Sequence, residues 1–236
     1  MKILLEDSLN KLSIEYDEEK LSKLENFYEL TVEKNKVMNL TAITDPEEFI
    51  IKHFVDSLAV LNFISFSPGM KAADLGTGGG FPGIPLAIFH PEVNFILIDS
   101  VNKKLNFISE AAAKLGISNV ETLHGRAEDI AHLDEHRENY DYVFSRAVSN
   151  MSSLSELALG LVKLNGMFVA YKSDNSHDEI KAAANALKLM GGTLDSENNI
   201  LLPNSDIKRC FYFIKKSTTT PKKYPRKPGE PARRPL

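Results

Sequence analysis

The sequence has little cysteine and no long apolar run, and both absences narrow the function classes open to it. Its 236 residues include a single cysteine, Cys210, so no internal disulfide can form, as is typical of a protein of the reducing cytoplasm. No apolar run approaches the roughly 20 residues that a membrane-spanning helix needs. Glu6 and Asp7 come too early for a signal peptide. We therefore expect a cytoplasmic protein that does not enter a membrane.

Metal binding and cysteine nucleophiles are equally poorly supported. The six histidines are scattered and, with one cysteine, show no metal-ligand spacing. Cys210 lies in a strand-like run, residues 210–214, where a buried structural thiol is expected. We predict neither a bound metal nor a catalytic cysteine.

What the chain does contain is the composition of an ordinary globular protein, with 43% apolar and 25% charged residues. Its length suits one large α/β domain with a small appendage. The net charge of −4 is unevenly spread, because residues 215–236 hold eight Lys and Arg and one acid. A basic end of this kind is either a frayed, solvated terminus or a contact with a phosphate backbone, and charge alone leaves both open.

The first third of the chain indicates helices. Leu21, Leu24 and Leu30 recur at helical spacing. Asp45 followed by Pro46 is a strong helix start, because aspartate caps free N–H groups and proline fits the first turn. The Ser-Pro-Gly run at 67–69 ends this part. We predict an N-terminal helical cap at 1–67, a main domain at 68–216 and a basic, proline-rich tail at 217–236.

From residue 71 onward, strands and helices alternate, which predicts an α/β fold with a doubly wound, mostly parallel sheet. The last two strands have few helices between them and indicate an antiparallel edge. The strands are expected at 72–76, 93–99, 120–124, 140–145, 167–172, 199–202 and 209–215, and the helices at 84–89, 103–115 and 179–190.

A glycine-rich turn from Asp74 to Gly83 follows the first strand and begins a helix. Glycines let the backbone turn tightly and approach a ligand, and the helix start offers free N–H groups. The spacing Gly78-x-Gly80-x-x-Gly83 also satisfies the dinucleotide fingerprint. Asp99 ends the second strand, where its carboxylate can accept hydrogen bonds from ribose hydroxyls. The turn therefore predicts a cofactor that contains adenosine, either NAD or S-adenosylmethionine.

Asp74 favours S-adenosylmethionine. A carboxylate inside the end of the strand suits a cationic aminoacyl group and would repel a pyrophosphate. The spacing Tyr16-x-x-x-Lys20, which a reductase could use, lies before the cofactor domain. An NAD-dependent oxidoreductase is the main alternative, and a non-catalytic RNA-binding module that uses only the tail is another.

The ordered set of motifs resembles the class I (Rossmann-like) S-adenosylmethionine-dependent methyltransferases. More narrowly, it resembles the bacterial 16S ribosomal RNA guanine-N7 methyltransferases, the glucose-inhibited division protein B family. The resemblance covers almost the whole chain, and its specificity lies in the combination. The motifs are Asn39-Leu40-Thr41, Lys52-His53-x-x-Asp56-Ser57-Leu58, Asp74-x-Gly76-x-Gly78-x-Gly80-Phe81-Pro82-Gly83, Asp99-Ser100-x-Asn102-Lys103, Gly125-Arg126-Ala127-Glu128, Ser145-Arg146-Ala147-Val148 and the tail from Pro221 to Pro231.

The resemblance implies a set of cofactor contacts. Gly76 and Phe81 would frame the methionine and sugar, and Asp99 would hold the ribose. Ala127 and Glu128 would face the adenine. The residues expected at the cofactor are Gly76, Thr77, Gly78, Phe81, Asp99, Ala127, Glu128 and Arg146.

Three polar residues on the helix that begins at Asp45 are also expected to have a role. His53, Asp56 and Ser57 would dock the helical cap on the main domain and close the cofactor pocket. Arg146, after the fourth strand, would lie beside the cofactor and the incoming base.

The acceptor atom follows partly by elimination. Methylation of a pyrimidine carbon needs a nucleophilic cysteine, and exocyclic amines usually go with an Asn/Asp-Pro-Pro-aromatic loop, where this chain has Ser145-Arg146-Ala147-Val148. Guanine N7 fits what remains, because its exposed lone pair needs no general base. We expect positioning, with no dedicated catalytic residue, to supply the acceleration. Arginine forks that could position the substrate are Arg126, Arg146 and Arg209.

The tail is expected to contact the RNA. Its basic residues are spaced by prolines around Tyr224, which predicts an extended strand that can follow phosphates and offer one ring for stacking. The expected RNA contacts are Lys222, Lys223, Arg226 and Lys227. Because the rest of the chain is acidic, we expect it to need an assembled structure in place of free RNA. The resemblance implies that this partner is the 16S ribosomal RNA in the small ribosomal subunit.

Overall fold

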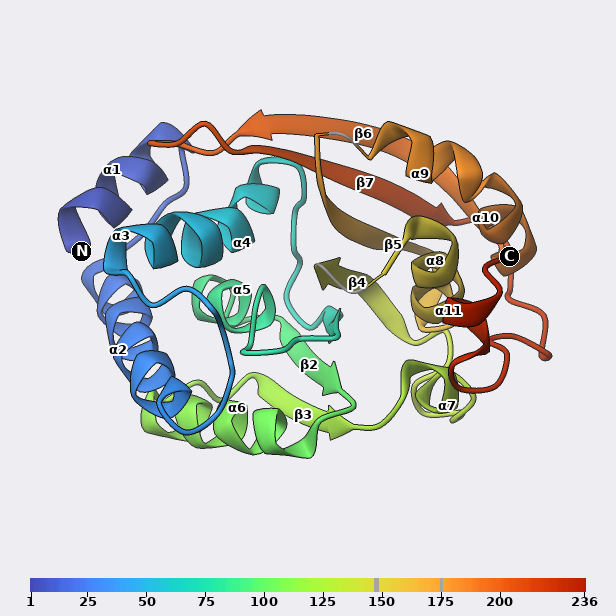
Figure 1. The fold of residues 1–236 in the computed structure, drawn as a ribbon, viewed down its shortest axis with the longest axis horizontal. Coiled ribbons are helices and arrows are strands. Elements are labelled where there is room, and N and C mark those ends of the chain that lie inside the picture. The colour runs from blue at the N-terminus through green and yellow to red at the C-terminus, as the bar shows by residue number, and fades with distance from the viewer. Residues whose placement is uncertain (147–148, 175) are drawn as a thin grey trace.

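The computed structural model describes residues 1–146, 149–174 and 176–236, and its centre is a seven-stranded sheet (Figure 1). The strands are β1 (Lys71–Leu75), β2 (Asn94–Asp99), β3 (Val120–His124), β4 (Tyr140–Arg146), β5 (Val162–Ser173), β6 (Gly192–Leu201) and β7 (Lys208–Lys216). Their order is β3-β2-β1-β4-β5-β7-β6; β1 to β5 are parallel, and β7 runs antiparallel to β5 and β6. This confirms the predicted doubly wound sheet with an antiparallel edge.

The side chains of each strand point alternately into two separate cores, because successive residues of a strand face opposite sides of the sheet. Phe144 and Val169 face one core, whereas their neighbours Val143 and Ala170 face the other. Both faces of the sheet are therefore buried, as expected for parallel strands covered by helices on each side.

The first face carries the N-terminal helices together with two helices of the main domain. These elements are α1 (Lys2–Lys11), α2 (Glu18–Asn35), α3 (Pro46–Phe49), the π-helix η1 (Ile50–Val55), α4 (Asp56–Leu58), the 3₁₀ helix η2 (Ala59–Asn62), α5 (Gly83–Phe89) and α6 (Asn102–Lys114). Asp45 caps α3 as predicted, accepting from the amides of Glu47 and Glu48. Leu9 and Phe27 share one apolar cluster with Phe95 of the sheet. The division at residue 67 stays a prediction.

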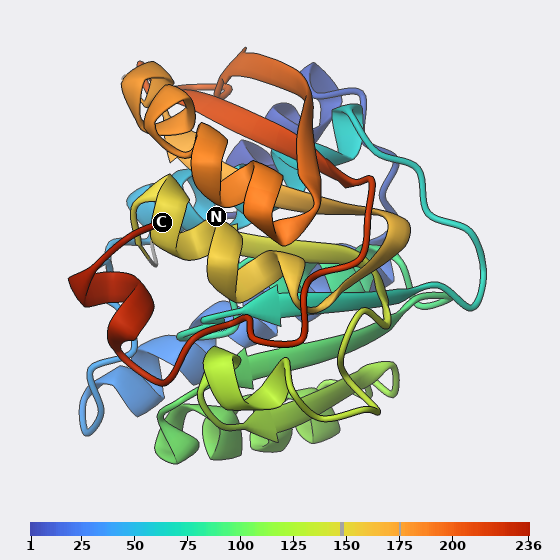
Figure 2. The same cartoon turned by 90° about the vertical axis from the view of Figure 1, so that its right-hand side faces the viewer.

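The second face is covered by shorter helices and by the end of the chain (Figure 2). The helices are α7 (Ala127–Ile130), α8 (Met151–Leu159), α9 (His177–Ala182), α10 (Ala184–Met190) and α11 (Glu230–Arg233). Tyr224, only 8% exposed, belongs to the core of this face. The tail, for which the sequence indicated an extended strand, thus contributes an aromatic side chain to this core.

Several elements differ from the sequence prediction. The strands expected at 199–202 and 167–172 begin earlier, at Gly192 and Val162, and the helix expected at 179–190 is split into α9 and α10. Helix α8 was not predicted. Gly191 explains where β6 begins, because its φ of 78° ends α10 in the left-handed region that glycine accepts. Among the described residues, no helix is both long and apolar enough to cross a membrane.

Candidate active site

The glycine-rich turn lies at the carboxyl end of β1 and is tied to β2. The amides of Gly76 and Thr77 both donate to the carbonyl of Ile98, at 2.9 and 3.0 Å. Gly76 and Gly78 adopt φ values of 73° and 60°, which side chains beyond glycine rarely accept. The turn is therefore a fixed backbone cradle at the edge where doubly wound sheets bind ligands.

Asp74 is fully buried beneath this cradle. Its Oδ2 accepts hydrogen bonds from the Thr77 hydroxyl at 2.6 Å and from the Gly83 amide at 2.8 Å. Oδ1 has no partner among the described residues. Burial raises the pKa of Asp74 to about 6, from an ordinary 3.8. A positive group bound at the turn would satisfy the orphan oxygen, whereas a pyrophosphate would add repulsion.

Gly83 shows why the last glycine of the turn is needed. A Cβ at this position would lie 2.8 Å from Asp74 Oδ2 and 2.8 Å from Leu97 Cγ. Both neighbours are buried, so a larger residue would push α5 away from the sheet.

Asp99 is held at the rim by two backbone amides. Its Oδ2 accepts from the Gly78 amide and its Oδ1 from the Val101 amide, each at 2.9 Å. A carboxylate oxygen has more than one acceptor site, so these bonds orient Asp99 and still leave capacity for a ribose hydroxyl.

A cavity of about 180 Å³ opens beside Asp99. Of the residues predicted at the cofactor, Gly76, Asp99, Ala127 and Glu128 line it, while Thr77, Gly78, Phe81 and Arg146 lie outside its lining. Arg126 also lines it, although the sequence suggested substrate positioning. The lining residues that sequence reasoning missed are Leu75, Ile98, Ser100, Gly125 and Leu157; Leu157 comes from α8 and had no local signal.

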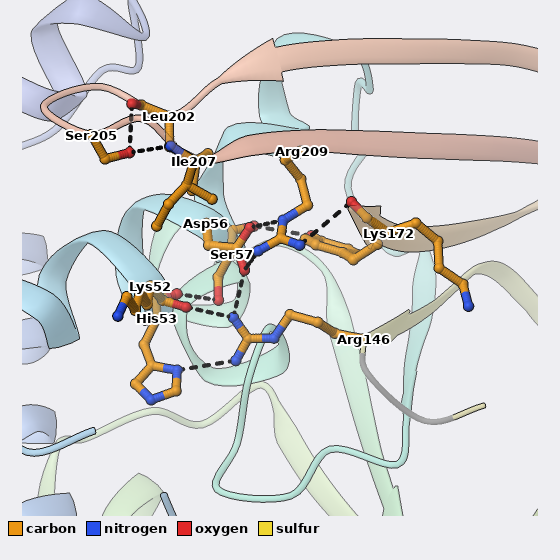
Figure 3. Close-up of polar contacts among 11 residues, drawn as sticks. Lys52, His53, Asp56, Ser57, Arg146, Lys172, Leu202, Ser205, Ile207 and Arg209 are labelled. Atoms are coloured by element: carbon orange, nitrogen blue, oxygen red, sulfur yellow. Dashed lines mark hydrogen bonds and ion pairs between the residues drawn. The ribbon is translucent and has the colours of Figure 1, made fainter. Parts of the chain in front are cut away.

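A second polar cluster lies where β4 and β7 meet the N-terminal helices (Figure 3). At its centre is Asp56, whose side chain is 1% exposed. Arg209 donates two hydrogen bonds to this carboxylate, from Nε to Oδ1 at 2.6 Å and from Nη2 to Oδ2 at 3.1 Å. Arg146 Nη1 also donates to Oδ2, at 2.9 Å. The fork of Arg209 is therefore directed at Asp56, whereas the sequence suggested that it would position substrate.

Arg146 is held from three directions. Besides Asp56, it donates from Nη1 to the carbonyl of Lys52 at 2.9 Å and lies 3.2 Å from His53 Nδ1 through Nη2. Both partners belong to the π-helix η1, a wide turn that often occurs at functional sites. A guanidinium has five N–H groups, so the three bonds that Arg146 makes within the described residues leave two for other partners.

His53 links this cluster to the glycine-rich turn. Its ring stacks on Phe81, with centroids 4.4 Å apart and planes at 15°, and Arg146 Cζ lies 5.6 Å from the same Phe81 ring. Burial, with the charges of Arg146 and Lys52, lowers the pKa of His53 to about 3, so its ring is neutral. Nδ1 can then accept from Arg146 while Nε2 donates to the Thr41 hydroxyl at 2.8 Å.

The basic tail residues divide into two groups. Lys222, Lys223 and Lys227 are exposed, whereas Arg226 is paired with the buried Glu156. Of the motif that follows β4, Ala147 and Val148 lie outside the described residues.

The strand order, the turn after β1 and the acidic residue that ends β2 define a class I methyltransferase fold. Solved structures agree. A SAM dependent methyltransferase from Aquifex aeolicus aligns with a TM-score of 0.53 at 19% identity, over 78% of this chain and 97% of that one. The YcgJ protein from Bacillus aligns with a TM-score of 0.55 at 13% identity, over 70% of this chain and 100% of that one.

The chain belongs to the family described as rRNA small subunit methyltransferase G, whose pattern matches residues 20–203. Two relatives are named ribosomal RNA small subunit methyltransferase G. The one from Desulforamulus reducens is 42% identical over all of this chain and 98% of its own. The one from Lachnoclostridium phytofermentans is 43% identical over 97% of this chain and 94% of its own. The resemblance found in the sequence, and with it a methyltransferase enzyme, is confirmed.

Proposed function

We propose that this protein transfers a methyl group from S-adenosylmethionine to N7 of a guanine in the 16S ribosomal RNA of the small ribosomal subunit. The observation that carries the proposal is the contact of Phe81 with His53 and Arg146. It joins the glycine-rich turn to an arginine cluster in a chain of the rRNA methyltransferase family.

The residues present fit the cofactor. Asp74 Oδ1 is a buried acceptor without a partner among the described residues, which suits the ammonium of the methionine part. Asp99 suits the ribose, and Ala127 with Glu128 lines the cavity that suits the adenine. When bound, S-adenosylmethionine supplies an electrophilic methyl group on a sulfonium.

The chain's own chemistry favours a ring nitrogen over a pyrimidine carbon. Cys210, its sole cysteine, is buried in β7, and burial raises the pKa of its thiol to about 11. Such a thiol is a poor nucleophile at neutral pH. Guanine N7 attacks with an existing lone pair, so the protein needs to align the base and exclude water.

Arg146 is the residue best suited to align the base. Asp56, His53 and the Lys52 carbonyl fix its guanidinium, and its side chain is still 14% exposed. Its two remaining N–H groups suit guanine O6 or a nearby phosphate. With Arg209 also positive and His53 neutral, the cluster carries a net charge of about +1, which favours an anionic substrate.

The lysines of the tail support contact with RNA. Lys222, Lys223 and Lys227 are each exposed, and exposed lysines can contact phosphates. We assign the protein to the cytoplasm, where small ribosomal subunits are assembled.

The test is methyl transfer from labelled S-adenosylmethionine to purified small ribosomal subunits. Borohydride–aniline treatment then cleaves RNA at N7-methylguanine, and we expect one labelled, cleavable site. Labelled RNA that resists cleavage would overturn the N7 assignment. Tighter calorimetric binding of NADH than of S-adenosylhomocysteine would overturn the cofactor assignment.

A further inference from the structure

The end of the chain is bound to the loop that joins α7 to β4. The Arg137 guanidinium donates to the carbonyls of Thr220 and Tyr224, at 2.8 and 3.0 Å. The His132 ring lies 2.8 Å from the carbonyl of Pro225. These contacts bind backbone carbonyls, so they fix the path of the segment and do not depend on its basic side chains.

A buried ion pair anchors the middle of this segment. Glu156, on α8, is fully buried, and its Oε1 accepts from the amide of Arg226 at 2.7 Å. The Arg226 guanidinium closes the pair, with Nε to Oε1 at 2.9 Å and Nη2 to Oε2 at 2.6 Å. The carboxylate raises the pKa of Arg226. Because a buried charge without its partner is strongly unfavourable, this pair sets the position of the chain at residue 226.

Three residues further on, the segment reaches the wall of the cofactor cavity. The Gly229 amide donates to Glu128 Oε1 at 2.9 Å, and Glu128 lines the cavity together with Leu157 of α8. Beyond it, the Pro231 carbonyl accepts from the Ser153 hydroxyl at 2.8 Å. Figure 1 accordingly shows α11 between α7 and α8. The segment thus holds both helices that wall one side of the cavity.

We propose that residues 220–236 form a positioning segment of the cofactor pocket, in which Arg226 and Gly229 hold Glu128 in the geometry that the adenine requires. The proposal rests on the proposed function, because it takes the cavity to be the adenine site. It gives the tail a role in cofactor binding besides any contact that its exposed lysines make with RNA.

Calorimetry with S-adenosylhomocysteine tests the proposal on the full chain. Arg226→Ala and Glu128→Ala should each weaken binding about tenfold, the factor for one lost hydrogen bond to a charged group. The double variant should bind like either single one, because both changes remove the same support. Glu128→Gln keeps an oxygen that can accept from Gly229 and should restore affinity. A triple change of Lys222, Lys223 and Lys227 to alanine should leave affinity unchanged.

A second measurement uses the unmodified protein, so it does not depend on whether a variant folds. Binding coupling is reciprocal, so the cofactor must also favour the docked segment. Saturating S-adenosylhomocysteine should slow trypsin cleavage after Lys223 about tenfold. Additive losses in the double variant, or a cleavage rate that the ligand leaves unchanged, would overturn the proposal. No binding of S-adenosylhomocysteine to the unmodified protein would instead contradict the proposed function.

Discussion

Replacing Asp74 by asparagine should make the protein more stable and, at the same time, less able to bind its cofactor. The side chain is fully buried, and its Oδ1 has no partner among the described residues. Asparagine keeps the shape and one acceptor oxygen, so the Thr77 and Gly83 bonds to Oδ2 can persist. What the substitution removes is the buried negative charge.

The magnitude follows from the pKa of Asp74, which burial raises from 3.8 to about 6. A rise of about 2 units means that ionising the group in the folded state costs about 3 kcal/mol more than in the unfolded chain. The asparagine leaves one buried amide N–H without a partner, which costs about 1 kcal/mol and offsets part of this 3 kcal/mol gain. The net gain at pH 8 is about 2 kcal/mol, or roughly 4–8 °C in melting temperature for a chain of this size.

The sign of the effect depends on pH. Because the folded-state pKa lies above the unfolded one, the penalty is absent below pH 3.8, grows as pH rises and is fully present above about pH 6. Asp74→Asn should therefore stabilise the protein at pH 8 and lose this advantage near pH 4. Urea unfolding at both pH values measures the difference directly.

The functional half of the prediction is measured by calorimetry at pH 8. Without the carboxylate, the ammonium of S-adenosylhomocysteine loses its charged partner, and affinity should fall at least tenfold. Asp99→Asn is the matched control, because it alters a carboxylate that backbone amides already satisfy; it should weaken binding without the gain in stability. A destabilised Asp74→Asn protein, or one with unchanged affinity, would contradict this prediction.

Three further predictions concern neighbouring groups. Arg146→Ala should lower methyl transfer about 100-fold but cost only about 1–3 kcal/mol of stability, since Arg209 still pairs with Asp56. Transfer assays measure the loss of activity and melting curves measure the loss of stability. A collapsed fold would instead make Arg146 part of the scaffold. The pKa of His53 is lowered to about 3, so the unfolded state takes up a proton first as pH falls, and stability should fall below pH 6.5, by about 2 kcal/mol at pH 5. His53→Gln should reduce this loss of stability in urea titrations. An identical pH profile for the variant and the unmodified protein would contradict this prediction. Gly83→Ala should destabilise by about 2–3 kcal/mol through the Asp74 and Leu97 contacts, whereas Gly79→Ala, whose Cβ would meet only ordinary contacts, should melt like the unmodified protein.

The fold was largely predictable, because its signals are local. Alternating strands and helices, the caps and the glycine-rich turn each occupy a few consecutive residues, and parallel strands joined by helices admit few arrangements. The observed sheet order and the antiparallel β7 follow that expectation. Strand β6 was mispredicted at its start, since residues 193–198 hold a single apolar side chain, Leu194, among polar ones and lack the apolar pattern of a buried strand.

The candidate site was predictable only in part. Asp74, Gly76 and Asp99 stand directly after or within strands, so the carboxyl edge of a parallel sheet brings them together. The pairing of Asp56 with Arg146 and Arg209 joins residues 90 and 153 positions apart, and no local pattern specifies which charges meet.

The sequence was therefore sufficient to predict the sheet, the glycine-rich turn after β1 and, through its motifs, the methyltransferase family. Which charged side chains pair with one another, by contrast, depends on contacts between distant parts of the chain. Arg209 and Arg226 look like substrate contacts in the sequence, yet each is directed at a buried carboxylate, Asp56 or Glu156. The physical reason is that burying Asp56 or Glu156 as an unpaired charge would be strongly unfavourable, and the fold brings a guanidinium within hydrogen-bond distance of each.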